Sequence, residues 1–272
     1  MATSIAELIA DRIDSMPAGE RRAAQTLVAN YPMAGLMTVA DYSAQAGVSS
    51  PTILRFVARL GFQNYPEFQS RLKEELAAQL QSPASRTAEK LPGDASPAVE
   101  ATLENIRETF RHVSPRQIAD MVSLLAQPKT RIFLLGGRFT DPLARYMAAH
   151  MTIIRPNVVH LTGQESNWRD RLLDMGKRDA LLIFDIRRYQ DSLIRFAEKA
   201  HQRGVQIVLF TDQWLSPIAR FARHVVAGRT AVPSAWDSSA ALFVVAEALI
   251  GEMTRQLESE SARRIREMES LR

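Results

Sequence analysis

The second half of the chain contains five short apolar runs, and stretches with a helical pattern separate them. Strands of a parallel sheet are buried on both faces, so their sequences are almost continuously apolar. We therefore expect an α/β domain with a five-stranded parallel sheet and helices on both faces. In such a sheet the ligand-binding crevice lies beyond the carboxyl ends of the strands. The five runs are Ile132–Leu135, Val158–Leu161, Ala180–Phe184, Gln206–Phe210 and His224–Ala227.

The first 80 residues predict short helices and no sustained strand. Two of these helices follow each other closely. The first is expected to begin after Thr38 and to end at Gly47, and the second to begin with Ser49 as its N-terminal cap and to end at Gly61. Two short helices joined by a tight turn that contains glycine form a helix-turn-helix. We therefore expect an all-α helix-turn-helix domain in front of the α/β domain.

The second helix of this pair has an apolar face and a polar face, because its apolar residues recur every three or four positions. In a helix-turn-helix the N-terminal residues of the second helix enter the major groove, where arginine pairs with guanine or a phosphate. Two cations and no anion occur between Val48 and Tyr65, which gives a local field suited to DNA. The residues expected to contact double-stranded DNA are Ser49, Ser50, Thr52, Arg55, Arg59, Asn64 and Tyr65.

The segment from Gly47 to Phe68, GVSSPTILRFVARLGFQNYPEF, closely resembles the N-terminal domain of the RpiR family of bacterial transcriptional regulators. That family typically reads GVSxATVxRFxxxLGFxxYxxF; here Pro51 replaces the usual alanine and Ile53 the usual valine. The resemblance implies DNA binding and a second domain of the sugar isomerase (SIS) type, a parallel α/β sandwich that senses phosphosugars. The expected boundaries are 1–80 for the helix-turn-helix domain, 81–97 for a linker rich in Pro and Ser, 98–127 for a helical lead-in, 128–250 for the SIS domain and 251–272 for a polar helix or tail.

The SIS resemblance implies two loops around a phosphate, and the chain departs from the family pattern in both. The family has G-x-G-x-S after its first strand, where this chain has Gly136, Arg138 and Thr140. After the third strand the family has S-x-S-G-x-T, where Asp185 and Arg187 replace the two serines and Arg188 the glycine. The expected ligand-binding residues are Gly136, Arg138, Thr140, Asp185, Arg187, Arg188, Thr211 and Ser238.

These replacements leave two interpretations of the pocket open. Arginines hold an anion by bidentate hydrogen bonds, so the domain either recognises an anion of another kind or fills the pocket with its own Asp–Arg pairs and only assembles the oligomer. The neighbouring cations are expected to lower the pKa of Asp185, away from the range useful for acid–base catalysis. We therefore predict that the chain is not an enzyme.

Composition excludes several classes of protein. The chain has no cysteine, so it forms no disulfide, thiolate nucleophile or Cys-type metal site. Its five histidines show no metal-ligand spacing, and we expect neither a metal nor a cofactor. No apolar run is long enough to cross a membrane, and the first residues do not resemble a secretory signal, so we expect a cytoplasmic protein. Residues 1–80 hold 7 Lys and Arg against 8 Asp and Glu, so bulk charge is no argument for DNA binding there.

These features together predict a transcriptional regulator whose SIS domain senses a small anionic metabolite, a phosphosugar or sugar acid, and thereby controls operator binding. Two-fold operators need two recognition helices about one DNA turn apart, so we expect a homodimer or homotetramer. The apolar stretch 240–250 is the expected packing surface for the partner subunit. The alternative is a sugar-phosphate isomerase of the SIS class with an accessory helical domain.

Overall fold

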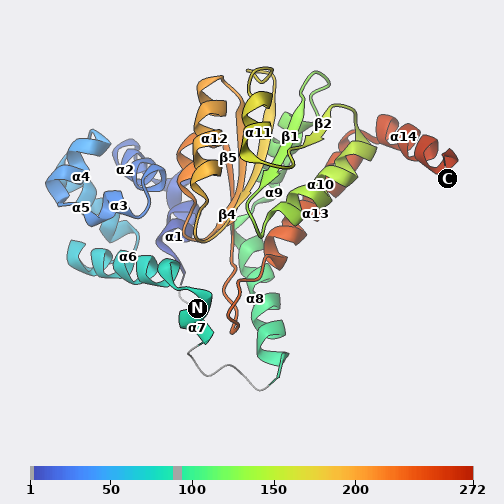
Figure 1. Cartoon of the computed structure of the whole chain (residues 1–272). Coiled ribbons are helices and arrows are strands. Elements are labelled where there is room, and N and C mark those ends of the chain that lie inside the picture. The colour runs from blue at the N-terminus through green and yellow to red at the C-terminus, as the bar shows by residue number, and fades with distance from the viewer. Residues whose placement is uncertain (1–2, 88–93, 272) are drawn as a thin grey trace.

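A computed structural model describes residues 3–87 and 94–271. A group of helices at the N-terminus lies beside a sheet that is covered by helices on both faces (Figure 1). The N-terminal group consists of α1 (Ile5–Arg12), the 3-10 turn η1 (Ile13–Ser15), α2 (Ala18–Ala29), α3 (Met33–Leu36), α4 (Val39–Ala46), α5 (Ser50–Arg59) and α6 (Tyr65–Leu80).

The caps of the N-terminal helices follow from the sequence. The hydroxyl of Ser4 accepts a hydrogen bond from the backbone of Glu7, whose side chain in turn accepts from the backbone of Ser4, and this capping box starts α1. Thr38 caps α4 by accepting from the backbone N–H of Asp41 at 3.1 Å. Gly47 ends α4 with φ +61°, a left-handed conformation that glycine adopts without strain. The predicted helix-turn-helix is therefore present.

These helices enclose a core of their own. Tyr42 of α4 and Phe56 of α5 meet edge to face with ring centroids 6.5 Å apart. Ile53 on α5 and Phe68 on α6 are fully buried in the same cluster. Complete burial of such side chains is worth about 1.5–3 kcal/mol each, so this core fixes the inward face of α5.

The second half folds as a five-stranded parallel sheet in the order β2-β1-β3-β4-β5, which confirms the predicted fold. One face is covered by α8, α9, α10 and α13, and the other mainly by α11 and α12. The elements are α8 (Ser96–His112), α9 (Pro115–Leu125), β1 (Ile132–Gly136), α10 (Asp141–Ile154), β2 (Val158–His160), α11 (Glu165–Arg171), β3 (Ala180–Asp185), α12 (Asp191–Gln202), β4 (Gln206–Asp212), η2 (Pro217–Phe221), β5 (His224–Gly228), α13 (Ala240–Gln256) and α14 (Glu258–Ser270).

The N-terminal helices are docked onto the α/β domain. The carboxylate of Glu7 on α1 accepts two hydrogen bonds from Arg229, which follows β5, at 2.7 and 3.0 Å. Both side chains are buried. His112 at the end of α8 lies 2.7 Å from a carboxylate oxygen of Asp11. A buried bidentate ion pair has a defined geometry, so it fixes the orientation of α1 on the α/β domain.

The segment between the two domains differs from a plain linker. A short helix, α7 (Pro83–Thr87), lies within the predicted linker, and α8 already begins at Ser96. Residues 88–93 of the predicted linker lie outside the described part of the chain. Among the described residues, no helix is long and apolar enough to cross a membrane.

The C-terminal helices correct the expected packing surface at 240–250 and add a contact to the expected polar helix or tail at 251–272. The apolar residues of α13 are largely buried in the core of their own chain, so most of them are not free to pack against a second subunit. The polar tail forms α14, and Arg264 donates to the carbonyls of Thr152 and Ile153 at the end of α10, at 2.7 and 3.0 Å. The tail is thus anchored to α10, in addition to being a solvated helix.

Candidate functional site

Helix α5 has an outward surface that the rest of the chain leaves open. Its inward residues Ile53, Phe56 and Val57 are buried, whereas Leu54 is 48% exposed and Arg55 is exposed. An exposed leucine beside an exposed arginine on a helix held by its other face is a surface available to a partner. If the rest of the chain covered the outward face of α5, this helix could not contact DNA. Within the described residues this face is open, as DNA binding requires.

Three of the predicted DNA contacts form a hydrogen-bonded row at the start of α5. The hydroxyls of Ser49 and Thr52 lie 2.9 Å apart, and Arg55 donates to the hydroxyl of Thr52 at 3.0 Å. Ser49 occupies the cap position but makes no capping hydrogen bond to the backbone, contrary to our expectation. The row orients the Arg55 guanidinium towards the N-terminal end of the helix, the end that enters the major groove in this motif.

Two predicted contacts are already engaged elsewhere. Arg59 forms an ion pair with Glu20 of α2, which is buried, and this carboxylate raises the pKa of Arg59. The Tyr65 ring is buried, and its hydroxyl donates to the carbonyls of Gly35 and Met37 at 3.1 and 3.0 Å. Tyr65 was therefore a wrong choice as a DNA contact, because it is a core residue that ties α6 to the residues around α3.

The two remaining predicted DNA residues have partial structural roles. Asn64 caps α6, since its side-chain oxygen accepts from the backbone of Glu67 at 2.9 Å, and the residue stays exposed. The Ser50 hydroxyl lies 3.2 Å from that of Ser43 on α4 and is half-buried. The Ser50 hydroxyl therefore mainly holds the turn between α4 and α5 in place and is less available as a donor to DNA.

A cavity of about 740 Å³ lies beyond the carboxyl ends of β1 and β3, where a parallel sheet is expected to bind its ligand. Five of the eight residues predicted to bind a ligand line it, together with residues that the sequence analysis did not select. The predicted lining residues are Arg138, Thr140, Asp185, Arg187 and Arg188, and the others include Gln81, Arg86, Gly137, Phe139, Trp236 and Asp237.

The other three predicted ligand residues are structural. Gly136 lets the strand pass the start of α10, since a Cβ there would lie 2.5 Å from the backbone of Asp141. Thr211 is fully buried, and its hydroxyl accepts from the backbone of Ser216 at 3.0 Å. The Ser238 hydroxyl accepts from the backbone of Ala240 at 3.3 Å, at the start of α13. None of the three lines the cavity.

The hydroxyl of Thr140 is also turned to the protein. It donates to the carbonyl of Phe184 at 2.6 Å and accepts from the backbone of Gly137 at 2.8 Å. Thr140 and Thr211 therefore both use their hydroxyls within the fold. A sugar phosphate bound here would meet arginines in place of a ring of hydroxyls.

Asp185 behaves differently from the prediction. Its carboxylate accepts from the hydroxyl of Ser216 at 2.5 Å and from the backbone of Gln190 at 3.2 Å, and it pairs with neither neighbouring arginine. Burial raises the pKa of Asp185 to about 7, and the nearby Asp212 carboxylate acts in the same direction, against those two hydrogen bonds. The predicted lowering by adjacent cations was wrong, because the side chains of consecutive residues after a strand do not share one direction.

Arg187 connects several parts of the pocket. Its Nε lies 3.0 Å from Oδ2 of Asp237, its Nη1 donates to the carbonyl of Ala78 at 3.1 Å, and its guanidinium stacks 4.3 Å from the centre of the Trp214 ring. The backbone N–H of Arg187 donates to Asp212 at 2.6 Å. Burial raises the pKa of Asp212 to about 6.

The residues that the sequence analysis missed complete one wall and the rim. Arg86 of α7 donates to Oδ1 of Asp237 at 3.0 Å and to the carbonyl of Val232 at 2.8 Å. Phe139 and Trp236 are 61% and 58% exposed, with ring centroids 5.7 Å apart. The sequence contained a signal for the two aromatic residues, because Phe139 and Trp236 lie within two positions of predicted ligand residues. It contained none for Arg86, because no periodic pattern surrounds that residue.

The interpretation of a pocket filled by its own ion pairs is partly correct. Asp237 pairs with both Arg86 and Arg187, but the cavity stays open beside them. Arg138 and Arg188 also line it, and neither has an ion-pair partner among the described residues. Arg138 instead lies over the ring of Phe139, 5.1 Å from its centre. The lining therefore carries more guanidinium groups than carboxylates, which favours an anionic ligand.

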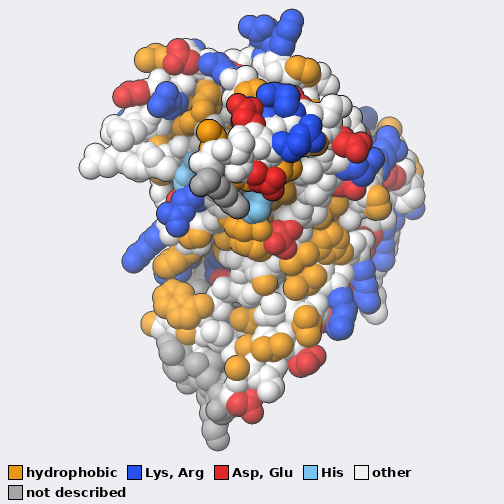
Figure 2. Space-filling view, turned by 90° about the vertical axis from the view of Figure 1, so that its right-hand side faces the viewer, with side chains coloured by type: hydrophobic (Ala, Val, Ile, Leu, Met, Phe, Trp, Pro, Cys, Tyr) orange, Lys and Arg blue, Asp and Glu red, His pale blue; other side chains and the backbone are white. Residues whose placement is uncertain are grey.

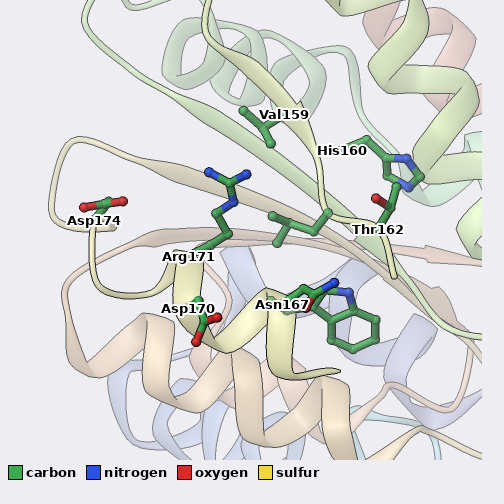
Figure 3. Close-up of a pocket in the computed structure, with 9 residues that line it drawn as sticks. Val159, His160, Thr162, Asn167, Asp170, Arg171 and Asp174 are labelled. Carbon is green, nitrogen blue, oxygen red and sulfur yellow. The ribbon is translucent and has the colours of Figure 1, made fainter. Parts of the chain in front are cut away.

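A second cavity of about 470 Å³ lies between β2 and α11 (Figure 3). Arg171 extends from α11 towards the strand, and Asp170 points the other way. His160 at the edge of this cavity is 2.8 Å from Asp141, so it is already paired. Within residues 3–87 and 94–271, no cluster of three or more His, Asp or Glu side chains is arranged to hold a metal ion.

Comparison with protein families assigns both domains. Residues 3–79 match the helix-turn-helix domain of the rpiR family, and residues 124–251 match the SIS domain. The chain belongs to the RpiR family. This RpiR-type protein with a SIS domain has relatives that are named transcriptional regulators, which supports a regulator and not an enzyme.

Among its relatives is the HTH-type transcriptional regulator HexR of Pseudomonas aeruginosa, 29% identical over 132 residues, in a match that spans 46% of this chain and 45% of that protein. HexR of Escherichia coli is 21% identical over 79% of this chain and 74% of its own length. The sugar isomerase domain of an RpiR transcription factor from Sphaerobacter thermophilus aligns with a TM-score of 0.61 at 22% identity, over 65% of this chain and 99% of that domain. NanR of Vibrio vulnificus, in complex with ManNAc-6P, aligns over 97% of both chains with a TM-score of 0.57 at 14% identity. At these identities the two structures show a shared fold.

Proposed function

We propose that this RpiR-type protein is a transcriptional regulator that binds operator DNA through α5 and senses a small anionic metabolite in the cavity beyond β1 and β3. The observation that carries the DNA-binding part is the open outward face of α5, with Arg55 held by Thr52 near the start of the helix. The residues proposed to contact DNA are then Ser49, Ser50, Thr52, Arg55 and Asn64. Arg59 contacts DNA only if its ion pair with Glu20 opens.

The test of DNA binding is the variant Arg55→Ala. If Arg55 pairs with a base or a phosphate, its loss weakens operator binding by about 1–3 kcal/mol, which is roughly 5- to 150-fold. Arg178→Ala is a matched control, because Arg178 is an exposed arginine in the loop before β3, far along the chain from α5. Electrophoretic shift titrations with both variants measure the effect. Equal affinity of the two variants removes Arg55 from the site.

The ligand part of the proposal is supported by charge. Four arginines line the cavity and two carboxylates oppose them, one of which, Asp185, has a pKa raised to about 7. We infer an anion held by guanidinium groups, a phosphosugar or a sugar acid. ManNAc-6P, with which the NanR protein is complexed, is a phosphosugar, which is consistent with this class. Calorimetry against a panel of phosphosugars and sugar acids tests it.

We further propose a homodimer or homotetramer, because a two-fold operator requires two recognition helices. Large hydrophobic side chains are exposed on α8, at Val99 and Leu103, and on the cavity rim. Figure 2 shows hydrophobic side chains gathered over the lower half of the face that carries α13 and α14. Exposed apolar side chains gathered on one face are typical of an interface. As a regulator of bacterial genes the protein would work in the cytoplasm.

The isomerase alternative has a poorer geometric basis. Asp185 has a pKa near neutrality, as an acid–base catalyst requires, but it is only 2% exposed. Both its oxygens already accept hydrogen bonds, from Ser216 and Gln190. An assay for aldose–ketose interconversion with the purified protein is expected to give no turnover.

A further inference from the structure

The anion cavity is built by both domains. Most of its lining comes from the loops of the SIS domain, but Gln81, Pro83 and Arg86 belong to the segment that follows α6. The C-terminal turn of α6 also contributes, since the carbonyl of Ala78 accepts a hydrogen bond from Arg187. A ligand in this cavity therefore meets residues that are covalently continuous with the helix-turn-helix domain.

Arg86 and Arg187 retain donors that no group of the described chain uses. An arginine has five N–H donors. Arg86 uses Nη1 for Asp237 and Nη2 for the carbonyl of Val232, which leaves its Nε. Arg187 uses Nη1 for Ala78, which leaves Nη2, and its Nε is buried without a hydrogen bond even though Asp237 lies 3.0 Å away.

The charge of this cluster is also incomplete. Asp237 stands between two guanidinium groups whose side chains are only 10% and 7% exposed, and the buried carboxylate of Asp212 also lies near Arg187, whose backbone N–H donates to it at 2.6 Å. The cavity also carries Arg138 and Arg188, so four guanidinium groups lie near three carboxylates, Asp185, Asp212 and Asp237, and an excess of positive charge remains in surroundings that water screens poorly. An anion with several oxygens satisfies both the free donors and the excess charge.

We propose that Arg86 is a ligand-binding residue, and that an anion held jointly by Arg86 and Arg187 clamps the end of α6 and α7 onto the SIS domain. This inference rests on the proposed anion cavity and adds the regulatory route from it. The bound anion joins Arg86 on α7 to Arg187, and Arg187 in turn holds the last turn of α6 through Ala78. If the anion binds more tightly when α6 and α7 are docked on the SIS domain, the bound anion stabilises this docked position by the same free energy, because linkage is reciprocal.

Inorganic phosphate serves as the probe, titrated by calorimetry into the full-length protein and into its variants. Loss of the charged contact in Arg86→Gln is expected to weaken phosphate binding roughly tenfold or more. Asp237→Asn removes the competing carboxylate and is expected to bind phosphate more tightly than the wild type. Arg178→Gln, an exposed arginine outside the cavity, is the matched control and is expected to leave the affinity unchanged.

Hydrogen exchange distinguishes the clamp from simple binding. Phosphate is expected to slow amide exchange in peptides from the end of α6 and from α7 in the wild type, and to leave these peptides unchanged in Arg86→Gln. Equal phosphate affinity of Arg86→Gln and Arg178→Gln, or unchanged exchange in the wild type with phosphate bound, would overturn the clamp alone. Failure of the wild type to bind phosphate at tens of millimolar would overturn the anion cavity as well, whereas operator binding by Arg55 is measured separately.

Discussion

The buried carboxyl group of Asp185 makes the stability of the SIS domain depend on pH. In the folded chain Asp185 holds its proton up to about pH 7, because it is buried, whereas an ordinary aspartate releases it near 3.8. Between these two values the folded state binds one proton more than the unfolded state, so the free energy of unfolding falls as the pH rises from about 4 to about 7. The full difference corresponds to about 4 kcal/mol, and it is lost above pH 7.

The variant Asp185→Asn removes this titration and keeps the shape of the side chain. Its amide oxygen still accepts from the backbone of Gln190, and its amide nitrogen donates to the hydroxyl of Ser216. We expect the variant to be more stable than the wild type at pH 8, by up to about 4 kcal/mol, and the difference to vanish near pH 4. In this variant the free energy of unfolding still falls with rising pH, but less steeply, because the pKa of Asp212 is also raised, to about 6.

Urea unfolding at several pH values, followed by tryptophan fluorescence, measures this effect. All three tryptophans of the chain lie between residues 168 and 236, so the signal reports on the SIS domain without a two-state assumption for the whole protein. Asp170→Asn, an exposed aspartate on α11, is the control and should leave the pH profile unaltered. The same pH slope in Asp185→Asn as in the wild type would show that Asp185 is ionised in the fold and that the reasoning is wrong.

Three further changes probe the fold around the two sites. Gly136→Ala forces a Cβ to 2.5 Å from the start of α10 and should lower the melting temperature strongly, whereas Gly176→Ala, with nothing within 4 Å of its Cβ, should not. Glu7→Gln removes the closer of two carboxylates paired with the buried Arg229, since Glu108 remains 3.7 Å away, and should cost up to about 3 kcal/mol, seen as faster hydrogen exchange in α1; unchanged exchange would contradict the docking. Tyr65→Phe should lower the free energy of unfolding by about 1–3 kcal/mol and leave operator affinity unaltered. If the folded variant binds the operator more weakly than the wild type, Tyr65 is a DNA contact after all.

The sheet and the helix-turn-helix were predictable because their signals are local. A strand buried on both faces is apolar at nearly every position, as Ala180–Asp185 is, so its sequence is enough to place it. The turn before α5 needs a left-handed residue, and Gly47 supplies it. Five strands and the two paired helices were found on such grounds, and the register of the sheet then placed the loops after β1 and β3 beside each other.

The pocket was harder to predict because its contacts are not local. Arg187 and Arg188 are adjacent in sequence to the carboxyl end of β3, yet Arg187 turns inward to Asp237 while Arg188, with φ +61°, lines the open cavity without an ion pair in the described chain. Asp185 therefore meets a serine where the sequence had indicated cations. Arg86 lies 151 residues away from its partner Asp237, in a stretch without any periodic pattern. No spacing rule connects such residues, and only the fold brings them together.

Helix α6 is the element through which an event in the pocket can reach the DNA-binding face. It comprises 16 residues, a rod about 24 Å long, and only the short segment 60–64 separates it from α5. At its start, Tyr65 and Phe68 pack together with ring centroids 5.6 Å apart, in the core that also holds α5. At its other end, Ala78 is held by Arg187 of the pocket. Because a packed helix moves as a unit, a ligand that tightens the grip on Ala78 changes the freedom of the whole rod, and with it the positions that α5 can take on an operator.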